Sequence, residues 1–288
     1  MDKKTAKDTV FSAKSQIKFI SDSPSVMGVV NVTDDSFYKG SRIYNSSDLI
    51  RKVEQMVQEG VSIIDIGGCS TRPGAKLIDQ DIEEKRVIPA IEIIAKHFPS
   101  ITISADTFRS QIASKAVAEG ALMVNDVSAG EIDKEMFQTV AKLDVPYVLM
   151  HMKGMPNSMQ KNPEYKDVFS EVYTFFETKL KAMKVVGLEK IILDPGFGFG
   201  KSLNHNFELL NRLGDFLKLD MPILVGLSRK SMIGRVLEVK PEHSLNGTSV
   251  LNTIALLNGA SILRVHDVKE AIETIKLLNA YRSANLSN

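Results

Sequence analysis

Eight short apolar runs recur along the chain, and this repetition constrains the fold more than any other feature of the sequence. Each run is rich in β-branched residues and is nearly continuous in apolar character, and each ends near a polar residue or glycine. Runs of this kind are typical of parallel strands that are buried on both faces. They lie at residues 26–31, 62–67, 102–107, 122–127, 146–151, 190–196, 222–228 and 261–267.

Amphipathic stretches separate the runs and predict helices. Residues 48–59 place apolar side chains on one face, and the Gly60 that follows is typical of a helix end. The same pattern predicts helices over 109–119, 164–186 and 267–281. The remaining connections are compatible with helices, although their periodicity is weaker.

Parallel strands need crossover connections, so eight strands that alternate with helices predict an α/β protein of the (β/α)₈ TIM barrel type. A doubly wound open sheet is the alternative, but it usually has fewer strands, and no G-x-G-x-x-G motif follows the first run. We expect one barrel domain over residues 21–288. Residues 1–20 would be a short N-terminal extension that forms a strand or hairpin at the bottom of the barrel.

Composition argues against several classes of protein. The 36 Lys and Arg residues nearly balance the 35 Asp and Glu residues, whereas a non-specific nucleic-acid binder needs an excess of cations. No stretch approaches the roughly 18 consecutive apolar residues of a membrane helix, and the N-terminus lacks the apolar core of a signal peptide. The single cysteine, Cys69, permits no internal disulfide. We therefore expect a cytoplasmic protein that binds neither nucleic acid nor membrane.

Polar side chains follow all eight apolar runs. In a (β/α)₈ barrel, the carboxyl ends of the strands and the loops after them form the active site. Some polarity there is expected in any barrel, because the chain is leaving the core, but a carboxylate, amide or cation at every strand exceeds that expectation. The residues are Asn31, Asp65, Asp106, Asn125 with Asp126, His151, Asp194, Ser228 to Lys230, and Arg264 with His266.

These residues form two chemical groups. One group supplies planar acceptors and an amide, which suit a flat heterocycle with ring N–H groups: Asp106, Asn125 and Asp194. The other supplies cations, which suit a phosphate or carboxylate: Arg72, Lys230, Arg264 and His266. For any one residue, a helix N-cap or a surface ion pair is an equally good interpretation. The whole set favours a substrate site.

Local motifs add to the case for an anion. The loop at 70–75 combines hydroxyls, a guanidinium and Pro-Gly, and the glycines of 194–201 would let the backbone approach a ligand closely. Ser228 is predicted to cap a helix whose first turn holds two cations, and a bound anion would offset their unfavourable interaction with the helix dipole. No nucleophile–base motif is present. A Schiff base on Lys230 is less favoured than contact with a ring or an anion.

Metal binding is predicted only weakly. No group of His and Cys residues has the spacing of a zinc site. Asn31 or an aspartate would suit Mg²⁺ as a single oxygen ligand, because that ion keeps several waters and is often held mainly by substrate phosphates.

In chain order, these motifs resemble those of the dihydropteroate synthases, folate-pathway enzymes that sulfonamides target. The resemblance covers nearly the whole chain after residue 25, and STRPG, SRKS and RVHD are its most specific parts. It implies a (β/α)₈ barrel and a homodimer. The matching segments are MGVVNVTDDSF (27–37), DIGGCSTRPGA (65–75), ADTFRS (105–110), NDVSAG (125–130), LMHMKGMP (149–156), LDPGFGFGK (193–201), GLSRKSMIG (226–234), GTSVLNTIALLNGA (247–260) and RVHDV (264–268).

The resemblance also implies a reaction: the diphosphate ester of hydroxymethyl-dihydropterin condenses with 4-aminobenzoate, giving dihydropteroate and diphosphate. The pterin ring would contact Asp106, Asn125, Asp194, Lys230 and Arg264. The diphosphate would contact Asn31, Arg72, Arg264 and His266, with Asn31 also close to Mg²⁺. The 4-aminobenzoate, for which sulfonamides are competitive analogues, would contact Phe37, Thr71, Arg72, Pro73, Phe199 and Ser231. Catalysis would rest on Asp106, Asp194, Lys230 and Arg264.

Three positions depart from the family pattern. Asp34 stands where the family usually has proline, which puts the resting conformation of the first loop in doubt. Cys69 stands where glutamate is common, and we interpret it as a small packing residue. Ala105 replaces a larger residue before Asp106. Two alternative functions remain open at this point: a corrinoid-dependent methyltransferase on a similar pterin-binding barrel, and a pterin-binding scaffold without catalytic activity.

Overall fold

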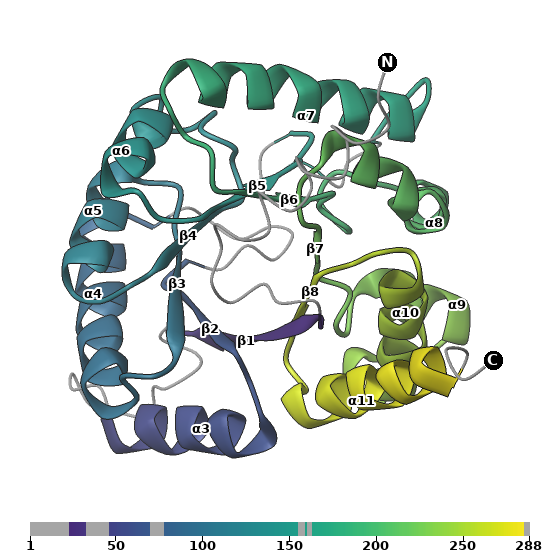
Figure 1. Ribbon diagram of the computed structural model, residues 1–288, viewed down its shortest axis with the longest axis horizontal. Helices are drawn as coiled ribbons and strands as arrows, with labels where there is room; N and C mark the ends of the chain where they lie inside the picture. Colours follow the sequence, from purple (N-terminus) through teal and green to yellow (C-terminus); the bar gives the residue numbers. More distant parts are fainter. Residues whose placement is uncertain (1–22, 33–45, 70–77, 155–158, 160–162, 285–288) are drawn as a thin grey trace.

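All eight predicted strands are present, and they form one parallel sheet. The computed structural model describes residues 23–32, 46–69, 78–154, 159 and 163–284. The sheet order is β6-β5-β4-β3-β2-β1-β8-β7, so consecutive strands are neighbours (Figure 1). The strands are β1 Ser25–Asn31, β2 Ile63–Gly67, β3 Thr102–Asp106, β4 Met123–Asp126, β5 Tyr147–Met150, β6 Ile191–Asp194, β7 Leu224–Val225 and β8 Ile262–Val265.

The two ends of the sheet meet between β6 and β7. Leu193 pairs with Ile223 in a parallel bridge just before β7, and the Leu193 N–H donates to the carbonyl of Pro222 at 2.9 Å. This contact brings the two outer strands together and distinguishes the structure from a doubly wound open sheet, which has two free edges. The predicted (β/α)₈ barrel is confirmed.

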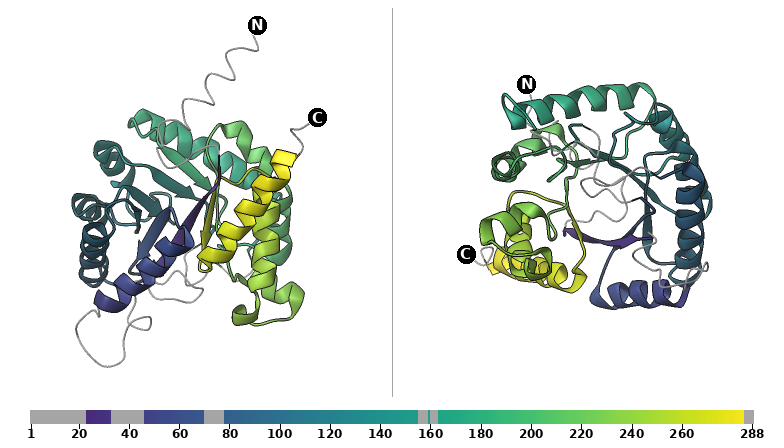
Figure 2. Two further views of the ribbon diagram at one scale, coloured as in Figure 1. Left: turned by 60° about the horizontal axis from the view of Figure 1, so that its bottom comes forward. Right: turned by 180° about the vertical axis from the view of Figure 1, so that it is seen from behind.

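Helices surround the strands on the outside, as Figures 1 and 2 show from three directions. The four helices predicted from periodicity are confirmed to within a few residues at each end. The helices of the described residues are α3 Ser46–Glu59, α4 Gln80–His97, α5 Ser110–Ala118, α6 Met136–Leu143, α7 Val168–Val185, α8 Leu203–Asn211, α9 Ser231–Leu237, α10 Leu245–Leu257 and α11 Val268–Ala284, with 3₁₀ turns η1 Leu213–Leu219 and η2 Pro241–His243.

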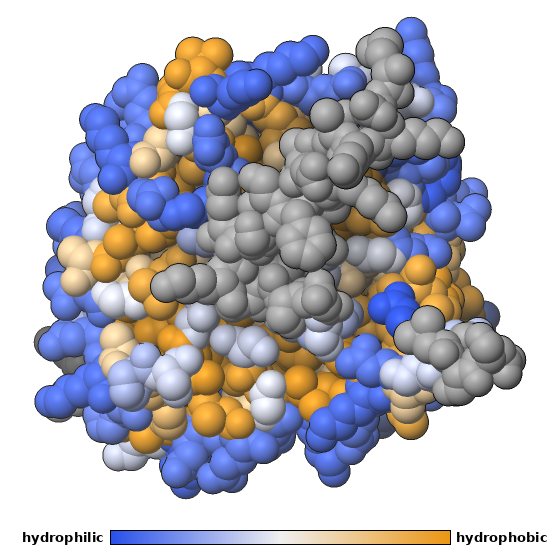
Figure 3. Space-filling model, in the orientation of Figure 1, coloured by the Kyte–Doolittle hydropathy of each residue, from blue (hydrophilic) through white to orange (hydrophobic). Residues whose placement is uncertain are grey.

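Two apolar cores hold the barrel together. The larger one lies between the outer face of the strands and the inner faces of the helices. Polar helix faces point away from it, and in Figure 3 hydrophilic residues accordingly occupy much of the outer rim while hydrophobic residues lie mainly inside. The smaller core is one layer of seven buried side chains: Met27, Ile63, Met123, Val148, Ile192, Leu224 and Ile262.

Strand periodicity places the polar residues directly above this inner layer. Residues i and i+2 of a strand project to the same face. Each step of two residues toward a carboxyl end therefore stays inside the barrel while moving up by one layer. On four strands this step leads from an apolar residue to a polar one: Ile63 to Asp65, Met123 to Asn125, Ile192 to Asp194, and Ile262 to Arg264. The barrel interior thus changes from an apolar layer to a set of charged and polar side chains at the carboxyl ends of the strands, which we call the mouth.

The predicted extension at residues 1–20 lies outside the described residues. So does Asp34, the departure in the first loop. Cys69 is buried and packs with Phe108, Val127 and Met150, which agrees with its interpretation as a packing residue. Among the described residues, no helix is both long enough and apolar enough to cross a bilayer.

Candidate active site at the carboxyl end of the barrel

The centre of the mouth is an arginine shared by two aspartates. Arg264 on β8 donates from Nε to Asp65 Oδ2 at 2.7 Å and from Nη2 to Asp106 Oδ2 at 2.9 Å. Asn125 donates from Nδ2 to the same oxygen of Asp65 at 3.0 Å. Because its amide nitrogen is used in this way, the carbonyl oxygen of Asn125 is left as an acceptor for a ligand.

Asp65 is the member of this group to which the sequence assigned no role. It is fully buried on β2 and orients both Asn125 and Arg264. The signal that would have identified it is strand parity: Asp65 lies two residues after Ile63, which belongs to the inner apolar layer. A carboxylate at that position must point into the barrel and needs a cationic partner.

Burial and charge shift the ionisation of the shared group. Burial, and then the nearby charge of Asp65, raise the pKa of Asp106, while Arg264 opposes that rise. Burial disfavours the charged form of Arg264, but the carboxylates of Asp65 and Asp106 outweigh it and raise its pKa. The guanidinium therefore stays charged between two acids. The surplus of acceptors suits a ligand that offers N–H groups or gains positive charge.

Lys230 and Asp194 form the second part of the mouth. The Lys230 ammonium donates to the carbonyl of Phe197 and lies 4.9 Å from the ring centroid of Phe199. Burial lowers the pKa of Lys230 to about 8, although Asp194 favours its charge. Asp194 accepts a hydrogen bond from Gly196 N at 2.8 Å, and burial raises its pKa. Lys230 thus bridges the loop after β7 and the glycine-rich loop after β6.

The glycines of the loop after β6 approach the protein's own backbone. Gly196 has a φ of +68°, and a Cβ there would lie 1.9 Å from the carbonyl oxygen of His151. At Gly200, where φ is +64°, a Cβ would lie 2.1 Å from the carbonyl oxygen of Lys153. The sequence predicted that these glycines would approach a ligand. The structure shows instead that they let this loop pack against the segment after β5.

A buried cation holds the same loop in place. The Lys201 ammonium donates to the carbonyls of His151, Gly196 and Phe199 at 3.2, 2.9 and 3.1 Å. It also lies 3.0 Å from Nδ1 of His151. Burial, followed by the charge of Lys201, lowers the pKa of His151 to about 2, so the imidazole is neutral. This histidine supports the loop from below.

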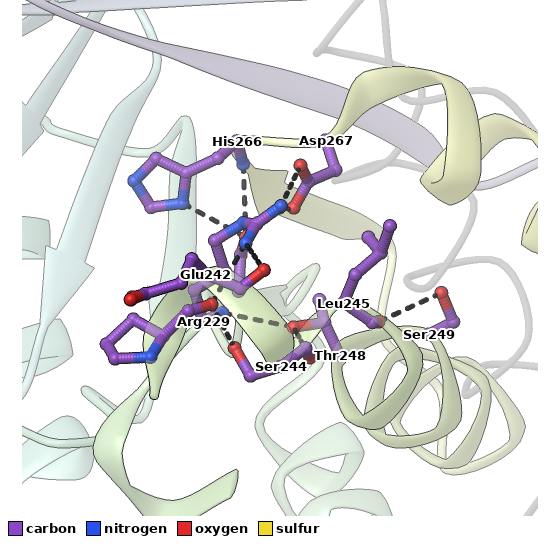
Figure 4. Close-up of polar contacts among 10 residues, drawn as sticks. Arg229, Glu242, Ser244, Leu245, Thr248, Ser249, His266 and Asp267 are labelled. Atoms are coloured by element: carbon purple, nitrogen blue, oxygen red, sulfur yellow. Dashed lines mark hydrogen bonds and ion pairs between the residues drawn. The ribbon is translucent and has the colours of Figure 1, made fainter. Parts of the chain in front are cut away.

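Ser228 connects the loop after β7 to the loop after β8. Its Oγ accepts from the backbone N–H of His266 at 3.2 Å and lies 3.0 Å from Nδ1 of the same residue (Figure 4). Burial and the charge of Arg264 lower the pKa of His266 to about 4, so the ring is neutral near pH 7. The contact with Ser228 fixes the orientation of the ring and leaves Nε2 as the other ring nitrogen. The prediction that Ser228 caps α9 was wrong, because Lys230 occupies the N-cap position and Ser228 holds the histidine.

Arg229 is paired within the protein. It donates from Nε and Nη2 to the two carboxylate oxygens of Asp267, at 2.9 and 2.8 Å (Figure 4). The sequence predicted that a bound anion would compensate the two loop cations. For Arg229 that interpretation was wrong, because Asp267 provides the compensating charge.

Comparison with known proteins places this site in a family. A family model described as pterin binding enzyme matches residues 27–266. The dihydropteroate synthase of Escherichia coli strain K12 is 43% identical over 263 residues, which cover 91% of this chain and 93% of that protein. This chain belongs to the dihydropteroate synthase family.

Solved structures of the family share the whole architecture. The Yersinia pestis dihydropteroate synthase in complex with a sulfonamide drug matches with a TM-score of 0.85 and 39% identity, covering 91% of this chain and 95% of that one. The Xanthomonas albilineans enzyme with 4-aminobenzoic acid matches with a TM-score of 0.84 and 39% identity, covering 91% and 94%. The resemblance stated from the motifs is confirmed.

Most of the residues that the family resemblance implies meet at one mouth. Arg264 bonds directly to Asp106, Asn125 is linked to Arg264 through Asp65, and the ammonium of Lys230 lies over Phe199. Asn31 ends β1, Ser231 begins α9, and His266 follows β8. Four implied contacts of 4-aminobenzoate or diphosphate lie outside the described residues: Phe37, Thr71, Arg72 and Pro73.

A pair of glycine substitutions tests the role of the close approach at Gly196. Gly196→Ala must move the loop away from His151, so we expect turnover to fall at least tenfold and thermal stability to drop. Gly187→Ala is the matched control, because Gly187 has a φ of +77° but no atom within 4 Å of a Cβ. It should cost only about 1 kcal/mol of backbone strain and leave turnover unchanged. Steady-state kinetics and thermal melts measure both, and equal losses in the two variants would contradict the close-approach argument.

Proposed function

We propose that the reaction of the dihydropteroate synthases takes place in this mouth, with its acids and Lys230 on the pterin ring and with Asn31, Arg264 and His266 on the diphosphate. The observation that supports this most directly is the Arg264 group, in which one guanidinium bonds to two buried acids and so brings a permanent cation and ring-binding acceptors together at one mouth. In addition, Asp65 Oδ1 is buried and has no hydrogen-bond partner within the described ranges. A ligand rich in N–H donors fits such a site.

The reaction breaks one bond and forms one. The C–O bond between the pterin methylene and the diphosphate breaks, and its electron pair leaves with the diphosphate. The amine nitrogen of 4-aminobenzoate then bonds to the methylene carbon and releases a proton to water. Positive charge develops on the ring system as the leaving group departs, and the carboxylates of Asp106 and Asp194 are placed to stabilise it. A neutral arylamine is already a nucleophile, so no strong base is required.

The departing diphosphate would be stabilised by residues from three strands. Arg264 would contribute a permanent cation, and His266 would contact the diphosphate through Nε2, since Nδ1 lies against Ser228. Asn31 would contribute its side-chain amide from the end of β1. We also assign Arg72 to this group, following the family motif.

Mg²⁺ fits this arrangement with Asn31 as its protein ligand. In the described part of the chain, no group of three or more His, Cys, Asp or Glu residues is arranged to hold a metal. Mg²⁺ does not need such a group, because it often retains water and is bound largely through substrate phosphates. When bound, it would supply charge neutralisation for the diphosphate. Asn31 would orient it at the rim.

The second substrate would lie beside Lys230. The ammonium of Lys230 lies over the ring of Phe199. From their family motifs we assign six residues to this subsite: Phe37, Thr71, Arg72, Pro73, Phe199 and Ser231. The Xanthomonas albilineans structure contains 4-aminobenzoic acid and the Yersinia pestis structure contains a sulfonamide. Both ligands fit the proposal that an arylamine occupies this subsite and that sulfonamides compete for it.

We further propose one catalytic domain over residues 21–288, with an N-terminal extension at 1–20, working in the cytoplasm. The lone cysteine supports that location, since Cys69 is buried and carries a free thiol. A homodimer is supported by apolar side chains left exposed on two packed helices. Val250, Ile254 and Leu257 share one face of α10, and Leu277 and Tyr281 share one face of α11.

The dimer proposal is tested by introducing charge on that face. We expect the wild-type chain to have twice its monomer mass in light scattering. Leu277→Glu should shift it toward the monomer, because a carboxylate would be buried without a partner. Val185→Glu, at an exposed position near the end of α7, should leave the mass unchanged. A monomeric wild-type chain at micromolar concentration would refute the proposal.

The activity is tested by release of diphosphate. Protein is incubated with pterin diphosphate, 4-aminobenzoate and Mg²⁺, and diphosphate is measured together with dihydropteroate. Asp106→Asn keeps the shape of the side chain but removes its charge, so we expect turnover to fall at least 100-fold with an unchanged fold. Asp215→Asn, at an ion pair near η1, is the control and should be fully active. Folded wild-type protein that releases no diphosphate would exclude the proposed function, and methyl transfer from methyl-tetrahydrofolate to cobalamin would replace it.

Lys230 predicts how activity depends on pH. Its pKa is lowered to about 8, so the ammonium is present below that pH and is lost above it. We expect kcat/KM for pterin diphosphate to fall as pH rises through about 8, because a charged donor to the ring disappears. Lys230→Arg should lower kcat/KM overall but remove this decline, since a guanidinium keeps its proton. A decline that persists in the arginine variant would assign it to another group.

A further inference from the structure

An arginine at the mouth of a barrel often binds an anionic substrate, but the side chain of Arg229 bonds to other parts of the protein. Besides its two bonds to Asp267, its Nη1 donates to the carbonyls of Pro241 and Glu242 in η2, at 2.9 and 3.0 Å (Figure 4). Four hydrogen bonds to the protein therefore fix the guanidinium. The pair with Asp267 is bidentate and partly buried, which makes it stronger and more directional than an exposed ion pair.

The backbone of Arg229 is held in a conformation that L-residues avoid. Its φ is +55°, in the left-handed region, and its N–H donates to Thr248 Oγ1 at 3.0 Å. Such a conformation is unfavourable for a non-glycine residue and persists when surrounding contacts impose it. The turn sends the two flanking side chains in different directions: Ser228 reaches His266, and Lys230 reaches Phe197.

The two members of the ion pair each adjoin a residue of the proposed site. Arg229 directly precedes Lys230, which we assign to the pterin ring. Asp267 directly follows His266, which we assign to the diphosphate. A bidentate bond between Arg229 and Asp267 thus joins the backbone segments that carry these two contacts.

We propose that Arg229 and Asp267 are a positioning pair that sets the distance between the ring-binding Lys230 and the diphosphate-binding His266. This inference rests on the function proposed above. The bond that breaks in that reaction lies between the ring and the diphosphate, so the spacing of the two contacts aligns it. A misplacement of about 1 Å costs on the order of 100-fold in rate in such sites.

Ligand binding distinguishes an ion pair that sets the spacing of two contacts from one that is needed only for folding. In Arg229→Gln and Asp267→Asn, each half of the substrate should still find its own contacts. Hydroxymethylpterin and inorganic diphosphate should therefore each bind within about threefold of wild type in calorimetry. The joined ligand, a methylene diphosphonate analogue of pterin diphosphate, should bind at least tenfold more weakly. Turnover should fall by tenfold or more, with KM for 4-aminobenzoate nearly unchanged.

Coupling and rescue provide the second readout. The double variant should be no slower than the slower single variant, because either substitution already breaks the pair. Combining Arg229→Lys with Asp267→Glu shortens one side chain and lengthens the other, and it should recover part of the lost turnover. Arg51→Gln is the control. It breaks an exposed ion pair with Asp48 on α3, and its turnover and ligand binding should equal those of wild type.

Two outcomes would overturn the proposal while wild-type protein remains active. One is wild-type turnover in Asp267→Asn, which is nearly isosteric and therefore the variant least disturbing to the fold. The other is an equal loss of affinity for both fragments and for the joined ligand, which would assign the pair to folding alone. An inactive wild-type protein would instead count against the proposed function.

Discussion

The charged mouth depends on the guanidinium of Arg264. Asp65 and Asp106 are buried carboxylates on neighbouring strands, and each would be costly to keep ionised in the barrel interior without a cationic partner. Arg264 bonds to both, and Asn125 completes the group through Asp65. The apolar floor beneath them strengthens these interactions because it keeps water away from their lower side. One side chain on β8 therefore organises three other strands.

The loops above this group are held by contacts of the same kind, in which a cation satisfies buried acceptors. Lys201 binds three carbonyls and draws the loop after β6 onto the end of β5. Arg229 does the equivalent for the loops after β7 and β8, using a carboxylate and two carbonyls. These side chains are used for structure, whereas Lys230, Arg264 and His266 are the groups that we propose to meet the substrate. The near-zero net charge of the chain gives no indication of this proposed division.

The parts of the structure that were predictable from sequence are those encoded locally. A strand buried on both faces needs a short apolar run, so all eight strands could be located, and strand parity then indicates which polar residues enter the barrel. Helix α4 was harder to recognise because Pro89 lies inside it and interrupts the expected pattern of a helix interior. Helix α10 carries exposed Val250, Ile254 and Leu257 as well as its buried residues, so its apolar positions show no single face.

The roles of individual charges were not predictable in the same way, because they depend on partners that are distant in the chain. Arg264 lies 199 residues from Asp65, and Arg229 lies 38 residues from Asp267. In the sequence, Arg229 and Lys230 are adjacent cations, and nothing local indicates which of them would bind an anion. Barrel closure separates them, since it brings Asp267 of the next loop within reach of Arg229 while Lys230 turns toward Phe197. The left-handed turn at Arg229 accompanies that separation, so a locally unfavourable backbone conformation directs one cation to Asp267 and the next one to the loop after β6.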